Sequence, residues 1–295
     1  MKKIKNLIDR IFKIDFWEVN LSEMTLKEFF KSKGSIYNNK IKIKSSFLGF
    51  FADPFIIKKN QNEIKLLVED FSFFSGGKIS LIKKKGKIYK RKILLRGKHF
   101  SYPFVMKYNK KLLIVPEMTE QQENKTYLFN GTKIIKEKKY LLGHKVIDPT
   151  ICKIGKLYWL FCALQISNNK INNNLYLFYS SNPFDNWISH KQNPVLKNKR
   201  HSRPGGSIIK YKNELYRPSQ NSTENSYGNQ LIINKIIKIS KYNYSEKQEF
   251  KIKPPYNFDG IHHLSFLNGL FAFDLKKNKY TLFKSLYYIL KVLKN

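Results

Sequence analysis

The sequence has few cysteines, and those present do not suggest a disulfide framework or a metal site. Cys152 and Cys162 are the only two in 295 residues, no CxxC pair occurs, and both lie in apolar surroundings (ICKIG and WLFCAL). Small buried residues in a reducing compartment are the simplest interpretation. We predict no cofactor. A divalent metal stays open, although no spaced set of histidine or cysteine ligands supports one.

Long apolar runs are also missing. No stretch of about 18 apolar residues occurs, so we expect no membrane-spanning helix. The first residues, MKKIKNLIDRIFKIDFW, are charged throughout and do not form the apolar core of a secretory signal. We therefore expect a cytoplasmic protein, with peripheral contact to the inner membrane face as an open alternative.

Acidic residues are scarce, with 21 Asp and Glu against 56 Lys and Arg, which gives a formal net charge of +35. Such a charge could attract nucleic acid, an anionic glycan or an anionic membrane. The lysines are scattered singly or in threes, and no nucleic-acid-binding motif is present, which argues against nucleic acid. General enrichment in Lys, Ile and Asn explains most of the excess. Contact with an anionic membrane remains the main alternative.

Aromatic residues, in contrast, make up 15% of the chain, and five segments repeat one pattern of two apolar strands around a polar turn. The equivalent positions Asp53, Tyr102, Asp148, Arg203 and His262 are spaced by 49, 46, 55 and 59 residues. The segments read ADPFIIKKNQNEIKLLVED, SYPFVMKYNKKLLIVPE, IDPTICKIGKLYWLFCA, SRPGGSIIKYKNELYRPSQ and HHLSFLNGLFAFD. This spacing is the length of a four-stranded propeller blade. We predict an all-β fold, a five-bladed β-propeller, with a β-sandwich as the alternative.

This prediction divides the chain into three parts. Residues 46–279 form the propeller. Residues 1–45 form an N-terminal extension with a helix from Leu21 to Lys33, which could also supply a strand that closes the ring. Residues 280–295 (YTLFKSLYYILKVLKN) form a basic amphipathic helical tail that packs on the propeller or lies on a membrane surface.

The repeat also predicts where polar side chains meet. The inner strand of each blade lines the central channel of a propeller, so the five equivalent residues should form one ring. Polar residues at the ends of the second strands add to it: Glu69, Asp70, Glu117, Gln220 and Asp274. Because burying ionic groups is costly unless they are paired, we interpret this ring as a functional site.

The ADPF and IDPT blocks resemble two signature blocks of the five-bladed glycosidases that include family-43 arabinanases and xylosidases. This resemblance implies a propeller of the arabinanase and levansucrase type. It further implies that Asp53 is a general base and that Asp148 tunes the pKa of the acid. The HHLS segment resembles a fifth-blade histidine of that group. The fourth-blade position, where those enzymes have their acid, holds Arg203, which cannot donate a proton near neutral pH, and simple hydrolysis is therefore in doubt.

A wider resemblance covers nearly all of residues 47–265. The stretches FFADPF, VEDFSFFSGGKISLI, HFSYPFV, IVPEM, LYLFYSSNPFDNWISHKQNPV, SRPGGSII and YRPSQNSTENSYG are similar to the N-terminal domain of glucosamine inositolphosphorylceramide transferase and its bacterial relatives. The resemblance implies glycan or glycolipid assembly. Its partners would be a glycan acceptor and a sugar donor, either nucleotide-linked or lipid-linked.

The residues fit such chemistry. Arg203 and Arg217 could contact phosphate, and Asp53 or Glu117 could deprotonate an acceptor hydroxyl. Gly205 and Gly206 would let backbone N–H groups approach the substrate, and Tyr102 and Tyr227 could offer flat faces to sugar rings. We therefore expect a glycosyltransferase of bacterial surface-polysaccharide or glycolipid synthesis. A family-43-like hydrolase and a non-catalytic glycan-binding module that assists a partner transferase are the alternatives.

Overall fold

The computed structural model describes residues 9, 11–45, 48–121, 123–167, 170–184, 186–197, 200–223 and 226–281. Apart from Tyr280 and Thr281, the predicted basic tail lies outside the described residues. None of the helices in the described part of the chain has the length and apolarity needed to span a bilayer.

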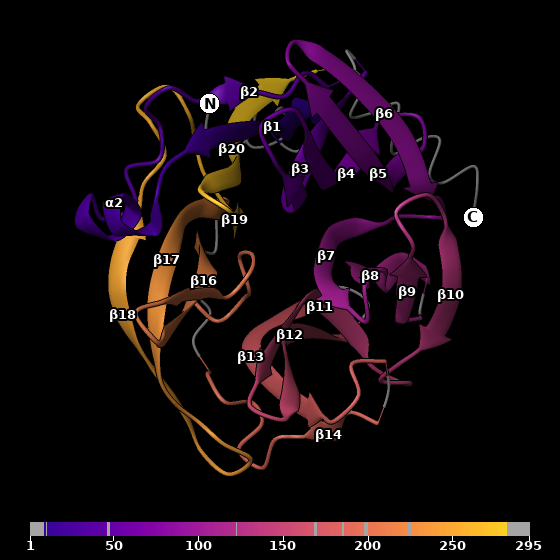
Figure 1. Cartoon of the computed structure of the whole chain (residues 1–295), viewed down its shortest axis with the longest axis vertical. Coiled ribbons are helices and arrows are strands. Elements are labelled where there is room, and N and C mark those ends of the chain that lie inside the picture. Colours follow the sequence, from indigo (N-terminus) through magenta and orange to yellow (C-terminus); the bar gives the residue numbers. More distant parts are fainter. Residues whose placement is uncertain are drawn as a thin grey trace.

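Within these ranges, twenty strands form five four-stranded antiparallel sheets arranged around a central axis (Figure 1). This arrangement confirms the five-bladed propeller. In each sheet the strand named first below lies nearest the axis. The blades are β3 (Gly49–Lys59), β4 (Ile64–Ser72), β5 (Gly76–Lys85) and β6 (Ile88–Leu95); β7 (Ser101–Tyr108), β8 (Lys111–Glu117), β9 (Lys125–Phe129) and β10 (Ile134–Lys139); β11 (Lys145–Ile154), β12 (Leu157–Ser167), β13 (Lys170–Ser180) and β14 (Ile188–Ser189); β15 (Ile209–Tyr211), β16 (Glu214–Thr223), β17 (Ser226–Ile239) and β18 (Tyr244–Ile252); and β19 (Leu264–Leu267), β20 (Leu270–Tyr280), β1 (Lys13–Glu23) and β2 (Ile41–Lys42). We number them blades one to five in this order.

Tight turns join the first two strands of most blades. Asn109 and Lys110 between β7 and β8, and Asn268 and Gly269 between β19 and β20, all have positive φ. Two-residue hairpins with positive φ at both positions match the twist of the flanking strands, and Asn and Gly favour them. The polar turn of the repeated pattern is thus a two-residue hairpin at these two positions.

The hydrophobic core is divided among the five interfaces between neighbouring blades. Phe104 of blade two, for example, packs in one cluster with Leu160 of blade three, and Phe161 of blade three in another with Ile236 of blade four. Of the other four clusters, one joins blades four and five, two join blades five and one, and one joins blades one and two. Because every blade buries both of its faces, its strands need apolar residues on both sides, which accounts for the high aromatic content.

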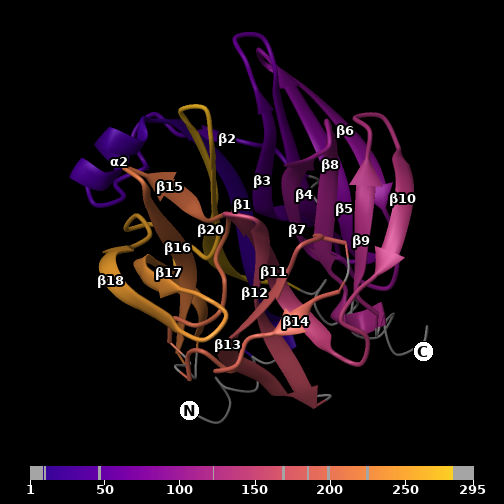
Figure 2. The same cartoon turned by 60° about the horizontal axis from the view of Figure 1, so that its bottom comes forward.

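The ring is closed by the N-terminal strand. β1 pairs with β20 along its whole length, from Lys13 opposite Tyr280 to Glu23 opposite Leu270. Figure 2 shows the same pair side by side at the junction of blades five and one. Residues 13–23 thus belong to blade five and supply the ring-closing strand that was one possibility for the N-terminal extension.

The predicted N-terminal helix exists but is shorter than expected. Helix α2 spans Leu26–Lys31, and Thr25 caps it by accepting a hydrogen bond from the backbone N–H of Glu28. Leu21, which was predicted to begin the helix, instead lies in the ladder with β20. The helix packs Phe29, which is fully buried, against the interface of blades four and five. A 3-10 turn, η1 (Thr119–Gln121), follows β8.

Candidate active site

A cavity of about 560 Å³ lies at the centre of the ring, and all five blades contribute to its wall. Seven of the residues predicted from the sequence line it: Asp53, Glu69, Glu117, Asp148, Arg203, Tyr227 and His262. The other lining residues are Ile14, Trp17, Phe50, Phe71, His99 and Ser101. The fold therefore brings together side chains that are far apart in the sequence, as the repeat predicts.

Three inner-strand residues share an uncommon backbone conformation. Asp53, Tyr102 and Asp148 have φ of 49°, 43° and 49°, a left-handed conformation that costs a non-glycine residue on the order of 1 kcal/mol. Each directly precedes a proline, and each lies where the register of its strand pair shifts. A bulge redirects a side chain and bends the strand. The repeated bulge therefore turns the start of these inner strands toward the axis.

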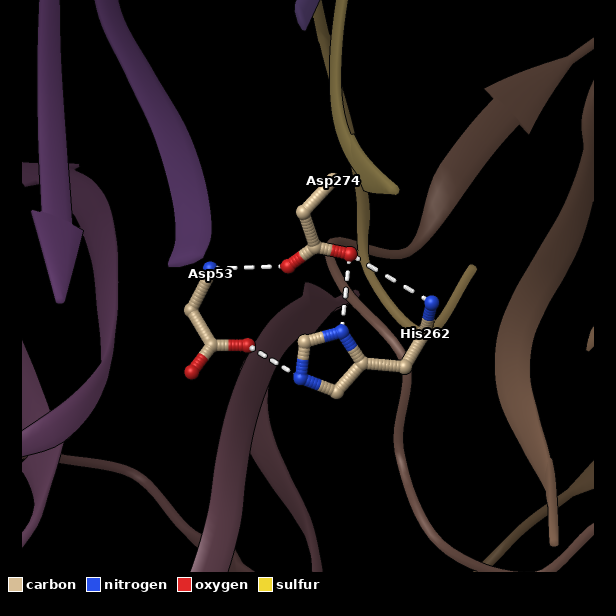
Figure 3. A group of neighbouring side chains, drawn as sticks. All are labelled: Asp53, His262 and Asp274. Atoms are coloured by element: carbon tan, nitrogen blue, oxygen red, sulfur yellow. Dashed lines mark hydrogen bonds and ion pairs between the residues drawn. The ribbon is translucent and has the colours of Figure 1, made fainter. Parts of the chain in front are cut away.

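Asp274 on β20 holds Asp53 and His262 in one buried hydrogen-bonded group (Figure 3). One of its carboxylate oxygens accepts a hydrogen bond from the backbone N–H of Asp53 at 2.9 Å. The other accepts a hydrogen bond from Nδ1 of His262 at 2.7 Å. The second oxygen also accepts the backbone N–H groups of His262 and His263, at 3.3 and 3.1 Å. On the other side of the imidazole, Nε2 lies 3.4 Å from Oδ1 of Asp53.

The ionisable side chains in this group shift one another's pKa values. Burial raises the pKa of Asp53 to about 7; His262 opposes this rise, and Asp274 and Asp148 reinforce it. Burial also favours the protonated form of Asp274, but His262 outweighs it and holds the pKa of Asp274 below its ordinary value. For His262, burial works against the charge, yet Asp274 and Asp53 raise its pKa. Asp53 is therefore the group balanced between its two protonation states near neutral pH.

Arg203 lies in the cavity and is fixed from several sides. Its Nε donates to Oδ2 of Asp148, and Nη2 lies 3.9 Å from Oε2 of Glu117. The side-chain amide of Gln220 donates to the same Asp148 oxygen at 2.8 Å. The guanidinium also covers the ring of Tyr227, 4.9 Å from its centroid. Burial works against this charge, but the neighbouring Asp148 raises the pKa of Arg203, which stays cationic.

Glu117 keeps its proton near neutral pH. Burial raises its pKa to about 8, Asp148 adds to the rise, and Arg203 opposes it. Its Oε2 accepts the backbone N–H of Asp148 at 3.1 Å, which links the end of β8 to the inner strand of the next blade. Glu117 is thus a carboxyl group that can donate a proton or a hydrogen bond in the cavity.

Glu69 and His99 form a second pair of titratable groups at the wall. Burial raises the pKa of Glu69 well above its ordinary value, with Asp53 and Glu117 adding to the effect. Nε2 of His99 lies 3.7 Å from Oε1 of Glu69, and Nδ1 accepts the backbone N–H of Gly77 at 3.1 Å. A Cβ on Gly77 would lie within 3 Å of both side chains, so only glycine leaves room for this pair.

Aromatic rings form the remaining side of the cavity. The indole of Trp17 stacks on His262, and Tyr227 packs edge-on against both rings at 6.1 and 5.3 Å. Phe50 and Phe71 stack on each other with centroids 4.7 Å apart. The cavity therefore joins an apolar wall from blades five and one to a polar wall from blades one to four.

Comparison with known proteins identifies the family. Residues 37–263 match the family described as glucosamine inositolphosphorylceramide transferase 1, N-terminal. The chain belongs to this family. It is 34% identical over 155 residues to glucosamine inositolphosphorylceramide transferase 1 of Oryza sativa subsp. japonica, and 35% identical over 152 residues to that of Arabidopsis thaliana. Each match covers 50% of this chain and 20% of the relative, so the chain matches about a fifth of the length of these proteins.

Solved structures agree on the fold. The β-xylosidase RS223 superposes with a TM-score of 0.54 at 11% sequence identity, covering 78% of this chain and 91% of that one. At this identity the likeness concerns the propeller architecture alone. All seven predicted residues that line the cavity fall within the family match, whereas Trp17 and Asp274 lie outside it.

Three residues predicted to contact substrate are used inside the protein instead. Tyr102 is fully buried, and its hydroxyl is hydrogen-bonded to Thr150 at 2.7 Å and accepts the N–H of Gly206 at 2.8 Å. The N–H of Gly205 donates to the Pro218 carbonyl at 3.0 Å. Gly206 is required by packing, because a Cβ there would lie 1.8 Å from the carbonyl oxygen of Leu264. These N–H groups are not available to a ligand.

Arg217 is also not a phosphate ligand. Its side chain is 1% exposed, and Nε and Nη2 form a two-pronged ion pair with Glu246 at 2.8 and 2.6 Å. The backbone carbonyls of His201 and Ser202 accept further hydrogen bonds from its guanidinium. Arg217 therefore ties β16 to β18 within blade four.

Asp70 and Gln220 also differ from the prediction. Asp70 follows Glu69 on β4, so it points to the opposite face of the sheet, where it accepts one hydrogen bond from Ser80 and pairs with Arg91 at 2.5 Å. Gln220 does not line the cavity, but its bond to Asp148 places it directly behind the wall.

The sequence reasoning missed Trp17, His99, Phe50 and Phe71. Trp17 reaches the cavity only because β1 pairs with β20, the last strand of the ring, and no short-range pattern reveals that pairing. His99 lies between two repeats and has no equivalent in the other blades. Phe50 and Phe71 flank the ADPF and VED blocks, so their position next to predicted site residues was the one available signal.

Asp53, His262 and Asp274 are close enough to suggest a metal site, since one ligand atom from each lies within 4.8 Å of the others. Their donors do not fit one. Both oxygens of Asp274 already accept N–H groups, and Nδ1 of His262 is engaged with Asp274. Only Nε2 of His262 and the carboxylate of Asp53 would be left for an ion, which is fewer protein ligands than a closed structural zinc site uses.

Proposed function

We propose that the cavity binds a sugar linked to a phosphate or a nucleoside diphosphate and transfers that sugar to a hydroxyl acceptor. The observation that carries this proposal is Arg203, which occupies the blade-four position where the related glycosidases are expected to have their acid. An alkoxide leaving group needs a proton from such an acid. A phosphate leaves as a stable anion and needs a cation instead, which an arginine supplies.

Asp53 is the base in this scheme. Its Oδ1 is buried and, within the described part of the chain, has no hydrogen-bond partner. The acceptor hydroxyl gives its proton to Oδ1 while its oxygen bonds to the anomeric carbon. The bond from that carbon to the phosphate oxygen breaks, and the electron pair leaves with the phosphate beside Arg203. Asp148 holds the guanidinium in place, so Asp148 is a positioning residue for this step.

An amino sugar suits the polar wall. Asp53, Glu69, Glu117 and Asp148 gather four carboxyl groups in one cavity of a chain that carries only 21 acidic residues. Such a wall can bind hydroxyl groups and an ammonium group, and the plant relatives are named for glucosamine transfer. We propose a surface polysaccharide or a glycolipid as the product.

We also propose that the protein works in the cytoplasm at an anionic membrane surface. The net charge of +35 supports this, as do lysines beside the apolar wall. Lys13 is adjacent to Ile14, which lines the cavity, and the ammonium of Lys279 lies 3.6 Å from the ring centroid of Phe16. Sedimentation with phosphatidylcholine vesicles, with and without phosphatidylglycerol, tests it. Salt-sensitive binding that needs the anionic lipid supports the proposal, and equal binding to both vesicles contradicts it.

Turnover is the test of the transferase. The purified protein is incubated with a panel of nucleotide-sugars, and release of the nucleoside diphosphate is measured for the wild type, Asp53→Asn and the control Asp70→Asn. We expect the wild type to turn over at least one donor. Asp53→Asn should reduce this rate at least about a hundredfold, and Asp70→Asn should keep it. Tight glycan binding without any turnover would instead support a non-catalytic module.

One observation favours a hydrolase as the second candidate. Glu117 carries a proton near neutral pH because its pKa is raised to about 8, so it could protonate a departing alkoxide in place of the missing blade-four carboxylate. Release of reducing sugar from arabinan or fructan, lost in Glu117→Gln, would support this candidate over the transferase.

A further inference from the structure

We propose that His262, held by Asp274, is a charged positioning residue that stabilises the carboxylate form of Asp53 and fixes the orientation of that side chain. This inference rests on the proposed function, in which Asp53 is the base. It assigns roles to a pair of residues at the fifth blade that the transfer step itself does not use.

The geometry fixes the orientation of the imidazole. Asp274 accepts a hydrogen bond from Nδ1–H at 2.7 Å, so Nε2 faces Asp53, whose Oδ1 is 3.4 Å away. Trp17 stacks on one face of the ring with centroids 3.7 Å apart. A Cβ on Gly228 would lie 2.8 Å from the Cβ of His262, so the chain of blade four packs closely beside it. The ring is therefore held on several sides and cannot turn away.

The surrounding charges favour the imidazolium. Asp274 on β20, Asp53 on β3 and Asp148 on β11 are the charged groups that act on His262, and all three are acidic. Tyr227 on β17 contacts the ring edge-on and Trp17 on β1 stacks on it, and neither contributes a charge. The neighbouring His263 stays neutral, because burial lowers its pKa to about 3.

The consequence concerns Asp53. A buried carboxyl without a cation nearby stays protonated and cannot act as a base near neutral pH. The imidazolium, 3.4 Å from Oδ1, stabilises the carboxylate of Asp53. The backbone N–H of Tyr102 donates a hydrogen bond to the other oxygen, Oδ2, at 3.1 Å. When Oδ1 accepts the proton of the acceptor hydroxyl, His262 keeps both of its own protons. His262 therefore acts through Asp53 and does not itself exchange a proton with substrate.

The test uses nuclear magnetic resonance of the full chain with labelled histidine. The ring nitrogens are titrated in the wild type, in Asp53→Asn and in His144→Gln, which serves as a control at an exposed histidine. We expect one histidine to be doubly protonated at pH 7 in the wild type. In Asp53→Asn the titration midpoint of this histidine should fall by about one pH unit. The ring-nitrogen signals of this histidine should be absent from the spectrum of His262→Gln. A midpoint for His262 near 6.5 that Asp53→Asn leaves unmoved would overturn the proposal.

A pH profile separates this role from a merely structural one. In His262→Gln the acid limb of kcat/KM should move to higher pH, with activity recovering in alkaline buffer, because Asp53 then ionises later. An equal loss at every pH would overturn the positioning role. The two proposals can fail separately: the histidine titration needs no substrate, whereas absence of turnover with every donor would contradict the proposed function and leave the titration result intact.

Discussion

The indole of Trp17 stacks on the imidazole of His262, with ring centroids 3.7 Å apart and ring planes 23° apart. Trp17 lies on the N-terminal strand and His262 lies in the last repeat, so this contact joins the two ends of the ring at the cavity wall. The strand that closes the propeller therefore also supplies a residue of the cavity wall.

Shortening this side chain should damage both stability and activity. Trp17 is buried, and replacing a buried Trp by Ala typically costs about 3–5 kcal/mol. We expect Trp17→Ala to lose that much unfolding free energy in urea denaturation, and Trp17→Phe, which keeps an aromatic face, to lose clearly less. A Trp17→Ala protein as stable as the wild type would show that the contact does not support ring closure.

Arg217 should matter for stability and not for ligand binding. Arg217→Ala leaves Glu246 buried without its partner, which we expect to cost about 3–5 kcal/mol in urea denaturation. The double variant Arg217→Met/Glu246→Leu removes both charges and should recover most of the loss. Weaker binding of a sugar donor by the folded double variant would restore Arg217 as a ligand-binding residue.

Asp53 should make the protein less stable as the pH rises. Its pKa is raised to about 7 by burial, while the unfolded chain ionises near pH 4. Between these values the folded state holds a proton that the unfolded state releases, so stability is highest below pH 4 and falls as the pH rises toward 7.

Asp53→Asn removes this dependence. Relative to the wild type, the variant should gain on the order of 1 kcal/mol or more between pH 5 and pH 8, measured by urea denaturation at both values. The control Asp70→Asn should show no such gain. A difference between Asp53→Asn and wild type that is constant with pH would show that Asp53 is ionised throughout this range.

The fold could be predicted because the sequence repeats a local signal. Asp53, Tyr102 and Asp148 each precede a proline at the start of an apolar strand, and the same chain geometry recurs in these three blades. Asp53, Asp148 and Arg203 could be placed in one site for that reason. Their position in the repeat carries the information, and no long-range contact had to be known.

The rest depends on contacts between distant segments. Arg217 resembles a ligand-binding arginine until Glu246, 29 residues later, is seen to pair with it across blade four. Tyr102 occupies one of the five equivalent positions around the axis, but its hydroxyl accepts a hydrogen bond from the N–H of Gly206 in another blade. Trp17 reaches the cavity only through the ladder with β20. Such partners are set by strand register, which local patterns do not reveal.

Binding of an anionic leaving group at Arg203 is the most direct test of the transfer mechanism. Calorimetry with inorganic pyrophosphate and with uridine, guanosine and cytidine diphosphates is applied to the wild type, Arg203→Gln and the control Arg91→Gln, whose arginine pairs with Asp70 outside the cavity. We predict that at least one of these anions binds the wild type and Arg91→Gln equally, and binds Arg203→Gln about 10- to 100-fold more weakly. Equal binding to Arg203→Gln, or no binding of any of them to the wild type, would contradict the account.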